Sequence, residues 1–416
     1  MPKRPNDVGP VTHCQVCTGT KLDEILSLGN QPIVQEYLTA AQIAEPEVTY
    51  PLTLVRCATC GLLQLNYVVD PKLVFPKQYP YRTGLTNMLI RNFESLADEL
   101  FANGTVAKGD LVVDIGSNDG TLLKSFKSRG ARVVGVEPTD AAKVANRARI
   151  ETLQEFFGPK SAARIVKKHG KAKVITATNV FAHINDTPAL VKSVKALMDN
   201  ETVFVSESQY LMDIVEKLEF DTIYHEHLRF YALKPLARLF ELHGLSLVDA
   251  ERIHAAGGSI RAYARKGAHP MSARAKALIK AETAAGLYDL KKLRAFAKRA
   301  EDAKRDLVAL LLSLKKKDVR IVGLTSSARS NTLLGFTHID RTLLDYNVEK
   351  SGSPKIGLYT PGTHIPVVDE SRLFTDQPEY ALVLSWHIGP ELIALMKKFG
   401  YKGKFIVPLP KAKIVQ

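Results

Sequence analysis

The sequence lacks the long hydrophobic runs and the apolar leader that mark membrane and secreted proteins. A membrane-spanning helix needs roughly 18 or more consecutive apolar residues, and no segment of the 416-residue chain approaches that length. The N-terminal run MPKRPND does not begin the apolar core of a secretory signal. We therefore predict a soluble, cytoplasmic protein that does not bind membranes.

The composition also lacks the bias of disordered or fibrous proteins. Hydrophobic residues make up 45% and charged residues 24%, as in ordinary globular proteins. Because a domain has roughly 150 residues, a chain of 416 residues is expected to form two or three domains. Lysine and arginine number 57 against 43 acidic residues, and the net charge of +14 favours anionic partners. Nucleic acids, nucleotides and sugar phosphates all fit this charge.

Cysteine is scarce, and its placement is informative. The four cysteines form two matched pairs, Cys14-x-x-Cys17 and Cys57-x-x-Cys60, which can converge on one tetrahedral Zn²⁺. Redox pairs are an alternative, but a redox pair usually opens a helix within a βαβ unit, and neither pair has that context. Structural disulfides are rare in the cytosol. Four thiolates leave no open coordination position, so we predict a structural zinc site.

After the cysteine pairs, short apolar strands alternate with segments of helical length. Predicted strands of a first series lie at 111–114, 132–137, 173–178 and 202–206, and those of a second series at 320–324, 342–345, 380–385 and 404–407. Helices are predicted at 85–103 and from 270 to about 317, the latter broken at Gly286. This alternation is typical of parallel α/β sheets. We predict an α/β protein with a zinc module at 1–80 and α/β domains at 81–250 and 251–416.

A glycine-containing turn follows the first strand of the middle domain. It comprises Asp114, Gly116, Ser117, Asn118, Asp119 and Gly120, and its glycines allow a ligand to approach the backbone at a helix N-terminus. Glu137, followed by Pro138, ends the next strand, where an acid can bind ribose hydroxyls. NAD is the alternative ligand, and an ordinary loop is another. The spacing differs from G-x-G-x-x-G, and the acids would repel a pyrophosphate but attract a sulfonium. We therefore predict S-adenosylmethionine.

Two further segments concentrate groups that transfer protons. Asn179 and His183 follow the third predicted strand of that domain, and Tyr224-His225-Glu226-His227 follows the fourth. The carboxyl ends of parallel strands border the ligand crevice of an open sheet, and imidazole, carboxylate and phenol groups are the usual general acids and bases. A satisfied polar network or a second metal site are alternatives. In an extended segment, Tyr224 and Glu226 would share one face and the two histidines the other.

These motifs together resemble one family. The cysteine pairs, the turn at 114–120, Tyr224-x-Glu226-His227, Gly257-Gly-Ser-Ile-Arg261, Asn331-Thr-Leu-Leu334 and Tyr359-Thr-Pro-Gly-Thr363 occur in one order across nearly the whole chain. The chain thus resembles the nucleotide-sugar C-methyltransferases that make branched deoxysugars. The resemblance implies a zinc module, a central Rossmann-like S-adenosylmethionine domain and a C-terminal Rossmann-like domain, with the nucleotide sugar between the last two. The typical substrate is a dTDP-linked 4-keto-6-deoxysugar that is methylated at C-3.

The resemblance also implies roles for single residues. His227 would be the base, with Glu226 orienting it, and Tyr224, His183 and Tyr79 would complete the active site; Tyr81 is the neighbouring alternative to Tyr79 and is assigned to substrate binding. Donors in or near turns of the last domain are nominated for the nucleotide, namely Arg329, Asn331, Thr332 and Lys355. The family run Ala-Lys-Gly-Asn-Thr reads Ala328-Arg-Ser-Asn-Thr332 here.

Two other functions compete with this one. A zinc-containing methyltransferase that binds or modifies RNA or DNA would suit the cysteine pairs and the charge of +14. The basic residues, however, are scattered and do not interleave with aromatics as in a base-stacking surface, so no nucleic-acid partner is predicted. A non-enzymatic zinc scaffold would leave the motifs at 114–120 and 224–227 without purpose. The oligomeric state stays open, and a monomer is compatible with the sequence.

Overall fold

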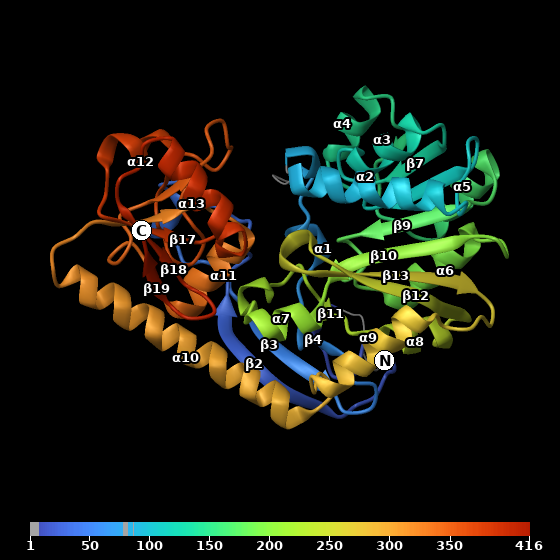
Figure 1. Ribbon diagram of the computed structural model, residues 1–416, viewed down its shortest axis with the longest axis horizontal. Coiled ribbons are helices and arrows are strands. Elements are labelled where there is room, and N and C mark those ends of the chain that lie inside the picture. Colours follow the sequence, from blue (N-terminus) through green and yellow to red (C-terminus); the bar gives the residue numbers. More distant parts are fainter. Residues whose placement is uncertain (1–7, 78–81, 86) are drawn as a thin grey trace.

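The computed structural model describes residues 8–77, 82–85 and 87–416. Figure 1 shows an N-terminal module, a central sheet domain and a C-terminal sheet domain, with the module lying between and below the other two. The predicted α/β class is confirmed. None of the helices in these described ranges combines the length and low polarity that a membrane crossing requires.

The N-terminal module is built on a small antiparallel sheet with strand order β11-β4-β3-β2. Its strands are β2 (Leu22–Gln31), β3 (Tyr50–Cys57), β4 (Leu63–Leu65) and β11 (Arg229–Phe230), while β1 (Gly9–Pro10) pairs with β5 (Tyr67–Val68) and helix α1 spans Pro71–Val74. The β11 strand comes from the central part of the chain and pairs with β4. The module is therefore joined to the segment that carries the predicted catalytic residues.

The central domain contains a seven-stranded sheet with the order β12-β13-β10-β9-β6-β7-β8. The strands are β6 (Leu111–Ile115), β7 (Arg132–Val136), β8 (Thr152–Leu153), β9 (Val174–Thr178), β10 (Val203–Gln209), β12 (Leu245–Ile253) and β13 (Ser259–Lys266). Pairing is parallel from β8 to β10, and β13 is antiparallel to both of its neighbours. The central strands β6 and β9 are buried throughout, as expected for a parallel sheet covered on both faces.

Helices cover both faces of this sheet. They are α2 (Asn87–Ala102), α3 (Thr121–Ser128), α4 (Ala141–Arg147), α5 (Pro159–His169), α6 (Thr187–Leu197) and α8 (Leu233–Leu242). Helix α7 (Leu211–Lys217) instead contributes Leu211 and Ile214 to the hydrophobic cluster that contains β2 residues of the module. The predicted boundary at residue 250 falls within β12, and the sheet continues through β13 to Lys266. The two strands pair along their length, so the hairpin cannot be divided between domains without exposing its backbone hydrogen-bonding groups.

The C-terminal domain has a second sheet, with the order β16-β15-β14-β17-β18-β19. Its strands are β14 (Ile321–Leu324), β15 (Asn347–Glu349), β16 (Val367–Asp369), β17 (Tyr380–Val383), β18 (Lys404–Val407) and β19 (Lys413–Val415), and its helices are α11 (Ala328–Thr337), α12 (Ser371–Asp376) and α13 (Gly389–Lys398). All pairs are parallel except β18 with β19. The strand predicted at 342–345 is wrong: Asp340 accepts hydrogen bonds from the Thr342 amide and hydroxyl, which makes a turn, and the strand begins at Asn347.

Two helices connect the sheet domains. Helix α9 (Ala273–Ala284) ends before Gly286, as predicted, and α10 (Leu290–Lys315) follows it. Buried α10 residues recur every three or four positions, at Leu293, Phe296, Ala300, Ala303, Leu307, Leu311 and Leu314, which is the stripe of a helix packed on one side. In Figure 1, α10 runs below β2 of the module to the C-terminal domain. One hydrophobic cluster includes residues of β2, α10 and α11, so the module and the C-terminal domain share a core.

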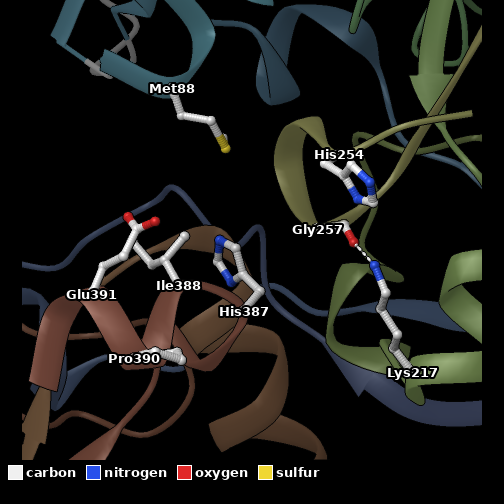
Figure 2. A pocket seen from close by; sticks show the side chains of 8 residues that line it. All are labelled: Met88, Lys217, His254, Gly257, His387, Ile388, Pro390 and Glu391. Carbon is white, nitrogen blue, oxygen red and sulfur yellow. Dashed lines mark hydrogen bonds between the residues drawn. The ribbon is translucent and has the colours of Figure 1, made fainter.

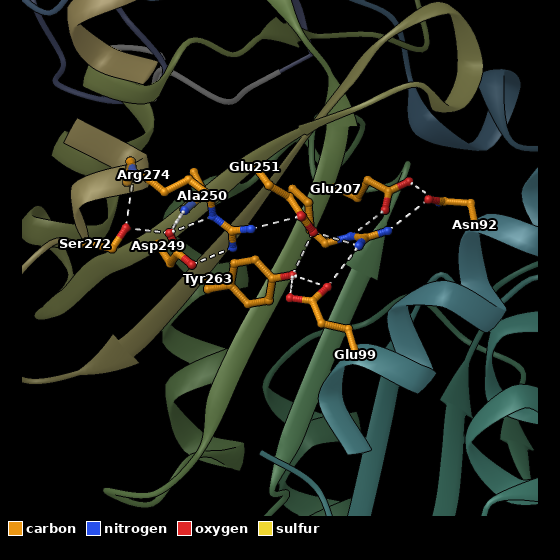
Figure 3. Close-up of polar contacts among 11 residues, drawn as sticks. Asn92, Glu99, Glu207, Asp249, Ala250, Glu251, Tyr263, Ser272 and Arg274 are labelled. Atoms are coloured by element: carbon orange, nitrogen blue, oxygen red, sulfur yellow. Dashed lines mark hydrogen bonds and ion pairs between the residues drawn. The ribbon is translucent and has the colours of Figure 1, made fainter. Parts of the chain in front are cut away.

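A buried polar network ties α2 to the central sheet (Figure 3). The Arg261 guanidinium on β13 lies 3.2 Å from Glu207 Oε2 on β10 and 2.8 Å from Glu251 Oε1 on β12. It also donates to Asn92 Oδ1 on α2 at 2.9 Å, and Asn92 Nδ2 donates to Glu207 Oε1 at 2.8 Å. A buried charge is stable only when it is paired and hydrogen-bonded, so these contacts fix the orientation of α2 over the sheet.

Candidate active site

The four cysteines lie together in the N-terminal module. Their sulfur atoms are all within 4.8 Å of one another, and the Cys14–Cys60 and Cys17–Cys57 sulfur pairs are each 3.5 Å apart. Tetrahedral zinc with bonds of about 2.3 Å places sulfur atoms about 3.8 Å apart. Cys14 and Cys57 are fully buried, and the amides of Val16 and Cys17 point at the Cys14 sulfur. The residues therefore fit a closed, structural zinc site.

The predicted cofactor residues meet at one edge of the central sheet. Strands β6, β7 and β9 are parallel neighbours, so Gly116, Glu137, Pro138 and Asn179, which directly follow these strands, lie along their carboxyl ends. The Asn179 amide donates to the Glu207 carbonyl of β10 at 2.8 Å. This edge is where open α/β sheets bind ligands.

The turn after β6 depends on glycine at two positions. Gly116 has φ +71°, and a Cβ built there would lie 2.5 Å from Val180 Cγ2. Gly120 has φ +78°, and its Cβ would lie 3.2 Å from Ala145 Cβ. Helix α3 begins immediately after Gly120. The turn thus passes close beneath the β9 loop and presents a helix N-terminus at the ligand edge.

The acids of this turn differ in their surroundings. Asp114 is buried and accepts a hydrogen bond from the Thr176 hydroxyl at 2.7 Å; burial raises the pKa of its carboxyl to about 7, opposed by the Thr176 bond. Glu137 accepts three hydrogen bonds, from the Asn118 amide at 3.0 Å, the Thr139 amide at 2.9 Å and the Thr139 hydroxyl at 2.6 Å. A carboxylate has about four acceptor positions, so Glu137 retains capacity for about one further donor, such as a ribose hydroxyl.

Two other predicted cofactor residues hold a neighbouring segment. Asn118 Oδ1 accepts the Thr83 amide at 3.0 Å, and Asp119 Oδ2 accepts the Gly84 amide at 2.9 Å. The Ser117 hydroxyl is buried, and it would lie 2.4 Å from a Cβ placed at Gly135 of β7. The side chains of Asn118 and Asp119 therefore fasten residues 83–84 to the turn. Tyr79 and Tyr81, just before that segment, lie outside the described residues.

Replacing Gly116 by valine should abolish S-adenosylmethionine binding with little effect on the fold of the other domains. The substitution puts a β-branched side chain at φ +71° and its Cβ 2.5 Å from Val180, and both force the turn to move. Isothermal titration calorimetry would measure the affinity. Gly109→Val is the matched control, because Gly109 also has positive φ but nothing lies within 4 Å of its Cβ. Equal affinity of the Gly116 variant and wild type would contradict this placement.

The predicted catalytic segment is a turn in the structure. The His227 amide donates to the Tyr224 carbonyl at 2.9 Å, so the segment is not extended and its side chains do not alternate between two faces. The ring centroids of Tyr224 and His227 lie 4.1 Å apart, and those of His183 and His227 lie 4.8 Å apart. Phe75 of the module stacks on His183 at 5.8 Å. Three predicted catalytic residues therefore form one cluster.

A backbone carbonyl sets the tautomer of His227. The Nδ1 atom lies 2.7 Å from the Thr222 carbonyl oxygen; because a carbonyl only accepts, Nδ1 carries the proton and Nε2 has the free lone pair. Burial lowers the pKa of His227 to about 4; the Thr222 bond opposes this shift and the Arg329 charge adds to it. His227 is therefore neutral near pH 7, with Nε2 ready to accept a proton. Burial and the Arg229 charge also lower the pKa of His183.

His225 faces the N-terminal module instead. Its ring meets Tyr50 edge-on at 5.9 Å, and Nε2 lies 3.3 Å from the Pro51 carbonyl oxygen. The side chain is 2% exposed. The side chains of the two histidines thus point in different directions, and His227 is the one that lies beside Tyr224 and His183. Glu226 lies between them in the chain and is 4% exposed.

The residues nominated for the nucleotide lie at the carboxyl edge of the second sheet. Asn331 donates to the Val34 carbonyl at 2.7 Å and to the Tyr37 hydroxyl at 3.1 Å, and its Oδ1 has no partner among the described residues. Lys355 Nζ donates to the Ser326 carbonyl at 2.6 Å and lies 5.2 Å from the Tyr37 ring centroid. Thr332 is buried and donates to the Ala328 carbonyl within α11.

Arg329 is in a different position from these three. Its guanidinium forms a two-pronged pair with Asp221, with Nε–Oδ2 and Nη2–Oδ1 distances of 3.0 and 2.7 Å. Asp221 follows α7 in the central part of the chain and is fully buried. The guanidinium that was nominated for a phosphate is thus already bonded to a carboxylate close to the turn that carries the predicted catalytic residues.

Several residues of this site were not identified from the sequence. Thr222, Asp221, Tyr37 and Trp386 are separated in the chain and belong to no motif spacing. The sequence offered one signal for two of them, because Asp221 and Thr222 directly precede the Tyr224–His227 cluster.

Thr325 is marked by its backbone conformation. It is a β-branched residue with φ +78°, a strained conformation that is frequent at functional sites.

A pocket of about 300 Å³ opens between the central and C-terminal domains. Figure 2 shows Met88 of α2 above it, Lys217, His254 and Gly257 on one side, and His387, Ile388, Pro390 and Glu391 of the C-terminal domain on the other. His387 Nδ1 is buried and has no partner within the part of the chain that the structure describes. The pocket combines apolar walls with a few polar groups, as small-molecule sites do.

Comparisons with known proteins place the whole chain in one family. Residues 14–75 match a family described as a zinc binding domain, residues 87–250 a methyltransferase domain, and residues 254–410 the C-methyltransferase C-terminal domain. C-methyltransferase NovU of Streptomyces niveus is 31% identical, with 98% of each chain covered. The protein belongs to the C-methyltransferases. This confirms the predicted enzyme class, and the domain matches together with the cysteine cluster support both predicted cofactors, S-adenosylmethionine and zinc.

Other similarities are confined to part of this C-methyltransferase. A ubiquinone biosynthesis O-methyltransferase of Colwellia psychrerythraea is 26% identical over 34% of this chain and 63% of its own. Magnesium protoporphyrin IX methyltransferase of Synechocystis PCC 6803, solved with bound S-adenosylmethionine, covers 43% of this chain and 80% of its own, with 14% identity and a TM-score of 0.33. The glycopeptide N-methyltransferase MtfA, solved with sinefungin, covers 42% and 93%, with 15% identity and a TM-score of 0.33.

Proposed function

We propose that this C-methyltransferase transfers a methyl group to the carbon beside the ketone of a nucleotide-linked, dTDP-type 4-keto-deoxysugar. The observation that carries the proposal is the state of His227: its Nδ1 proton is bonded to the Thr222 carbonyl, and its Nε2 is free to act as a base. A carbon can take a methyl cation only after it has become nucleophilic, and removal of a proton beside a ketone achieves this.

The chemistry then divides among the side chains of the cluster. His227 Nε2 takes the proton from C-3, the C–H electron pair moves into an enolate, and the charge gathers on the C-4 oxygen. A neutral imidazole with a pKa of about 4 is a weak base, so the enolate oxygen needs strong stabilisation. Tyr224 and His183, whose rings are 4.1 and 4.8 Å from that of His227, are the donors proposed for this oxygen. Glu226 is proposed to orient the base, and Tyr79 to contact the sugar.

S-adenosylmethionine, when bound, would supply the electrophilic methyl group that the nucleophilic C-3 takes up. Its proposed binding residues are the turn from Asp114 to Gly120, with Glu137, Pro138 and Asn179. They lie at the carboxyl edge of the central sheet, the same edge at which the loop carrying His183 follows β9. His227 afterwards releases its proton to solvent.

The nucleotide is proposed to lie against the C-terminal domain. Strand β14 has its successor β15 on one side and β17 on the other, and such a switch point is where open α/β sheets bind ligands. The loop after β14 leads to the N-terminus of α11, which favours a diphosphate. Asn331, Thr332 and Lys355 are proposed to line this part, with Tyr81 on the sugar side.

A direct assay tests the proposal. The purified enzyme is incubated with S-adenosylmethionine bearing a labelled methyl group and with a dTDP-linked 4-keto-6-deoxysugar. We expect the label in the sugar nucleotide, attached to C-3, as seen by mass spectrometry and by carbon NMR. Label attached to an oxygen, or label incorporated into RNA and not into any sugar nucleotide, would reject the proposed substrate.

A further inference from the structure

The Arg329–Asp221 pair joins the C-terminal domain to the segment that precedes the catalytic turn. Arg329 lies in the first turn of α11, and Asp221 lies in a 3₁₀ turn at Phe220–Thr222. Both side chains are almost completely buried, with exposed fractions of 8% and 0%. Such a paired fork is directional, because the planar guanidinium fits a carboxylate in one geometry.

Two further groups complete the contact. Trp386 Nε1, from the loop after β17, donates to Asp221 Oδ2 at 2.8 Å, and the Trp386 ring lies 5.4 Å from the Arg329 guanidinium carbon. Arg329 Nη1 also lies 3.4 Å from Glu219 Oε2. A Cβ at Gly257 would lie 2.8 Å from that Glu219 oxygen and 3.1 Å from Arg329 Nη1. We call Glu219, Asp221, Arg329 and Trp386 the interdomain clamp.

Asp221 of the interdomain clamp is adjacent in the chain to Thr222, whose carbonyl is hydrogen-bonded to His227. Thr222 directly follows Asp221, its carbonyl oxygen is the partner of His227 Nδ1 at 2.7 Å, and its hydroxyl donates to Gln209 of β10. A shift of the 3₁₀ turn would therefore move this carbonyl and with it the imidazole. Because Asp221 accepts hydrogen bonds from α11 and from the loop after β17, the position of the C-terminal domain is transmitted to the turn.

We propose that Arg329 is a positioning residue for the catalytic base: through Asp221 and Thr222 it fixes the orientation of the His227 imidazole, and it does not bind the diphosphate of the substrate. The inference rests on the proposed function, in which His227 removes the proton. It replaces the role nominated for Arg329 from the sequence. It also gives a reason for arginine at this position, since a lysine at the same place would offer a point charge and not a fork.

The inference also predicts a change in the pH dependence of the rate, because the charges around His227 affect its pKa. Its neighbours are Tyr224 and Phe230 from its own segment, His183 from the loop after β9, and Arg329 from α11. Burial, and after it the Arg329 charge, lower the pKa of His227. Loss of the Arg329 charge would remove this effect and leave Asp221 and Glu219 uncompensated, so the pKa of His227 would rise. The base would then be protonated, and inactive, up to a higher pH.

The test compares Arg329→Gln, Arg329→Lys and Trp386→Phe with the wild-type enzyme. For Arg329→Gln we expect kcat to fall by about 10²-fold, as for a misplaced catalytic group, with KM for the nucleotide sugar unchanged and the acid limb of the pH–rate profile shifted to higher pH. Arg329→Lys keeps the charge but not the fork, so kcat should fall partway without a shift of the acid limb. Trp386→Phe keeps a ring over Arg329 but loses the bond to Asp221, and should lower kcat while leaving KM unchanged.

Arg320→Gln serves as the matched control. Arg320, just before β14, has two acidic partners, Asp345 and Asp376, but at the opposite end of the sheet, and its replacement should change neither kcat nor the acid limb. A strong rise in KM with unchanged kcat in Arg329→Gln would show that Arg329 binds substrate, and would overturn the inference. If Arg329→Gln does not fold, an unchanged kcat in Trp386→Phe overturns it. The variant His227→Asn tests the proposed function separately. If His227 is not the base, this variant exchanges the substrate proton at the wild-type rate, whatever the Arg329 variants show.

Discussion

Replacement of His227 by asparagine is expected to lower kcat by about 10²–10⁴-fold, the usual contribution of a general base. Asparagine can still donate to the Thr222 carbonyl, which lies 2.7 Å from Nδ1 in the native protein, but it has no basic nitrogen to take the C-3 proton. Affinity for S-adenosylmethionine should be retained. The decisive measurement is solvent deuterium exchange at the carbon beside the ketone, made with S-adenosylhomocysteine so that methyl transfer cannot follow.

His225→Asn is the matched control for this experiment. His225 is buried, like His227, but faces Tyr50 and Pro51 of the module, so its variant should exchange the proton at close to the wild-type rate. If exchange survives in the His227 variant and is lost in the His225 variant, then His225 is the base and the assignment to His227 is wrong. In the wild type, the pKa of His227 near 4 keeps the imidazole unprotonated above about pH 5. Exchange should therefore persist at pH values where an exposed histidine, with a pKa near 6.5, would be protonated.

Loss of zinc is expected to destabilise the N-terminal module and, through it, the active site. Structural zinc contributes an apparent free energy of about 10–16 kcal/mol in small zinc-finger peptides, and the present site has all four sulfur atoms within 4.8 Å of one another. Cys57→Ser should lower the zinc content from about one per chain to near zero and should lower the Tm markedly. Metal analysis by mass spectrometry and thermal unfolding would measure both effects.

A chain of hydrogen bonds connects the cysteine cluster to the segment that carries His183, so we expect kcat to fall when zinc is lost. Gln15, between Cys14 and Cys17, accepts from the buried Arg229 at 3.0 Å, and Arg229 donates in turn to the Ile184 carbonyl, next to His183. S-adenosylmethionine binding, which depends on the turn at 114–120, should be affected less than kcat. Re-addition of zinc should restore activity to chelator-treated wild type but not to Cys57→Ser. A metal-free protein with an unchanged Tm would reject the structural role.

Contacts from the module to the proposed active site give a reason why the module is part of the enzyme. Phe75 stacks on His183, Tyr50 packs against His225, and Tyr37 contacts Asn331 and Ser326 of the C-terminal domain. A module with a small core cannot hold such contacts in place without added constraint, and a metal ion is the usual one. The zinc is therefore remote from the chemistry but necessary for the geometry around it.

Features set by local spacing could be predicted from the sequence. The two C-x-x-C pairs, the glycines of the 114–120 turn, the break at Gly286 and the alternation of strands and helices depend on neighbouring residues, and each appears in the structure. The strand predicted at 342–345 failed for a local reason as well, because Asp340 diverts the chain into a turn. Apolar residues there, such as Leu343 and Leu344, are buried without being in a strand.

By itself, then, the sequence determined the fold class and the cysteine cluster, and it predicted the cofactor turn and the group of residues from which the proposed base is drawn. Only the tertiary structure decided which histidine meets Tyr224 and His183, because this depends on a turn closed by the bond from the His227 amide to the Tyr224 carbonyl. It likewise decided that Arg329 pairs with Asp221, 108 positions away in the chain. Such partners are brought together by the packing of α11 against a turn of another domain, and nothing in the local sequence of either residue specifies that contact.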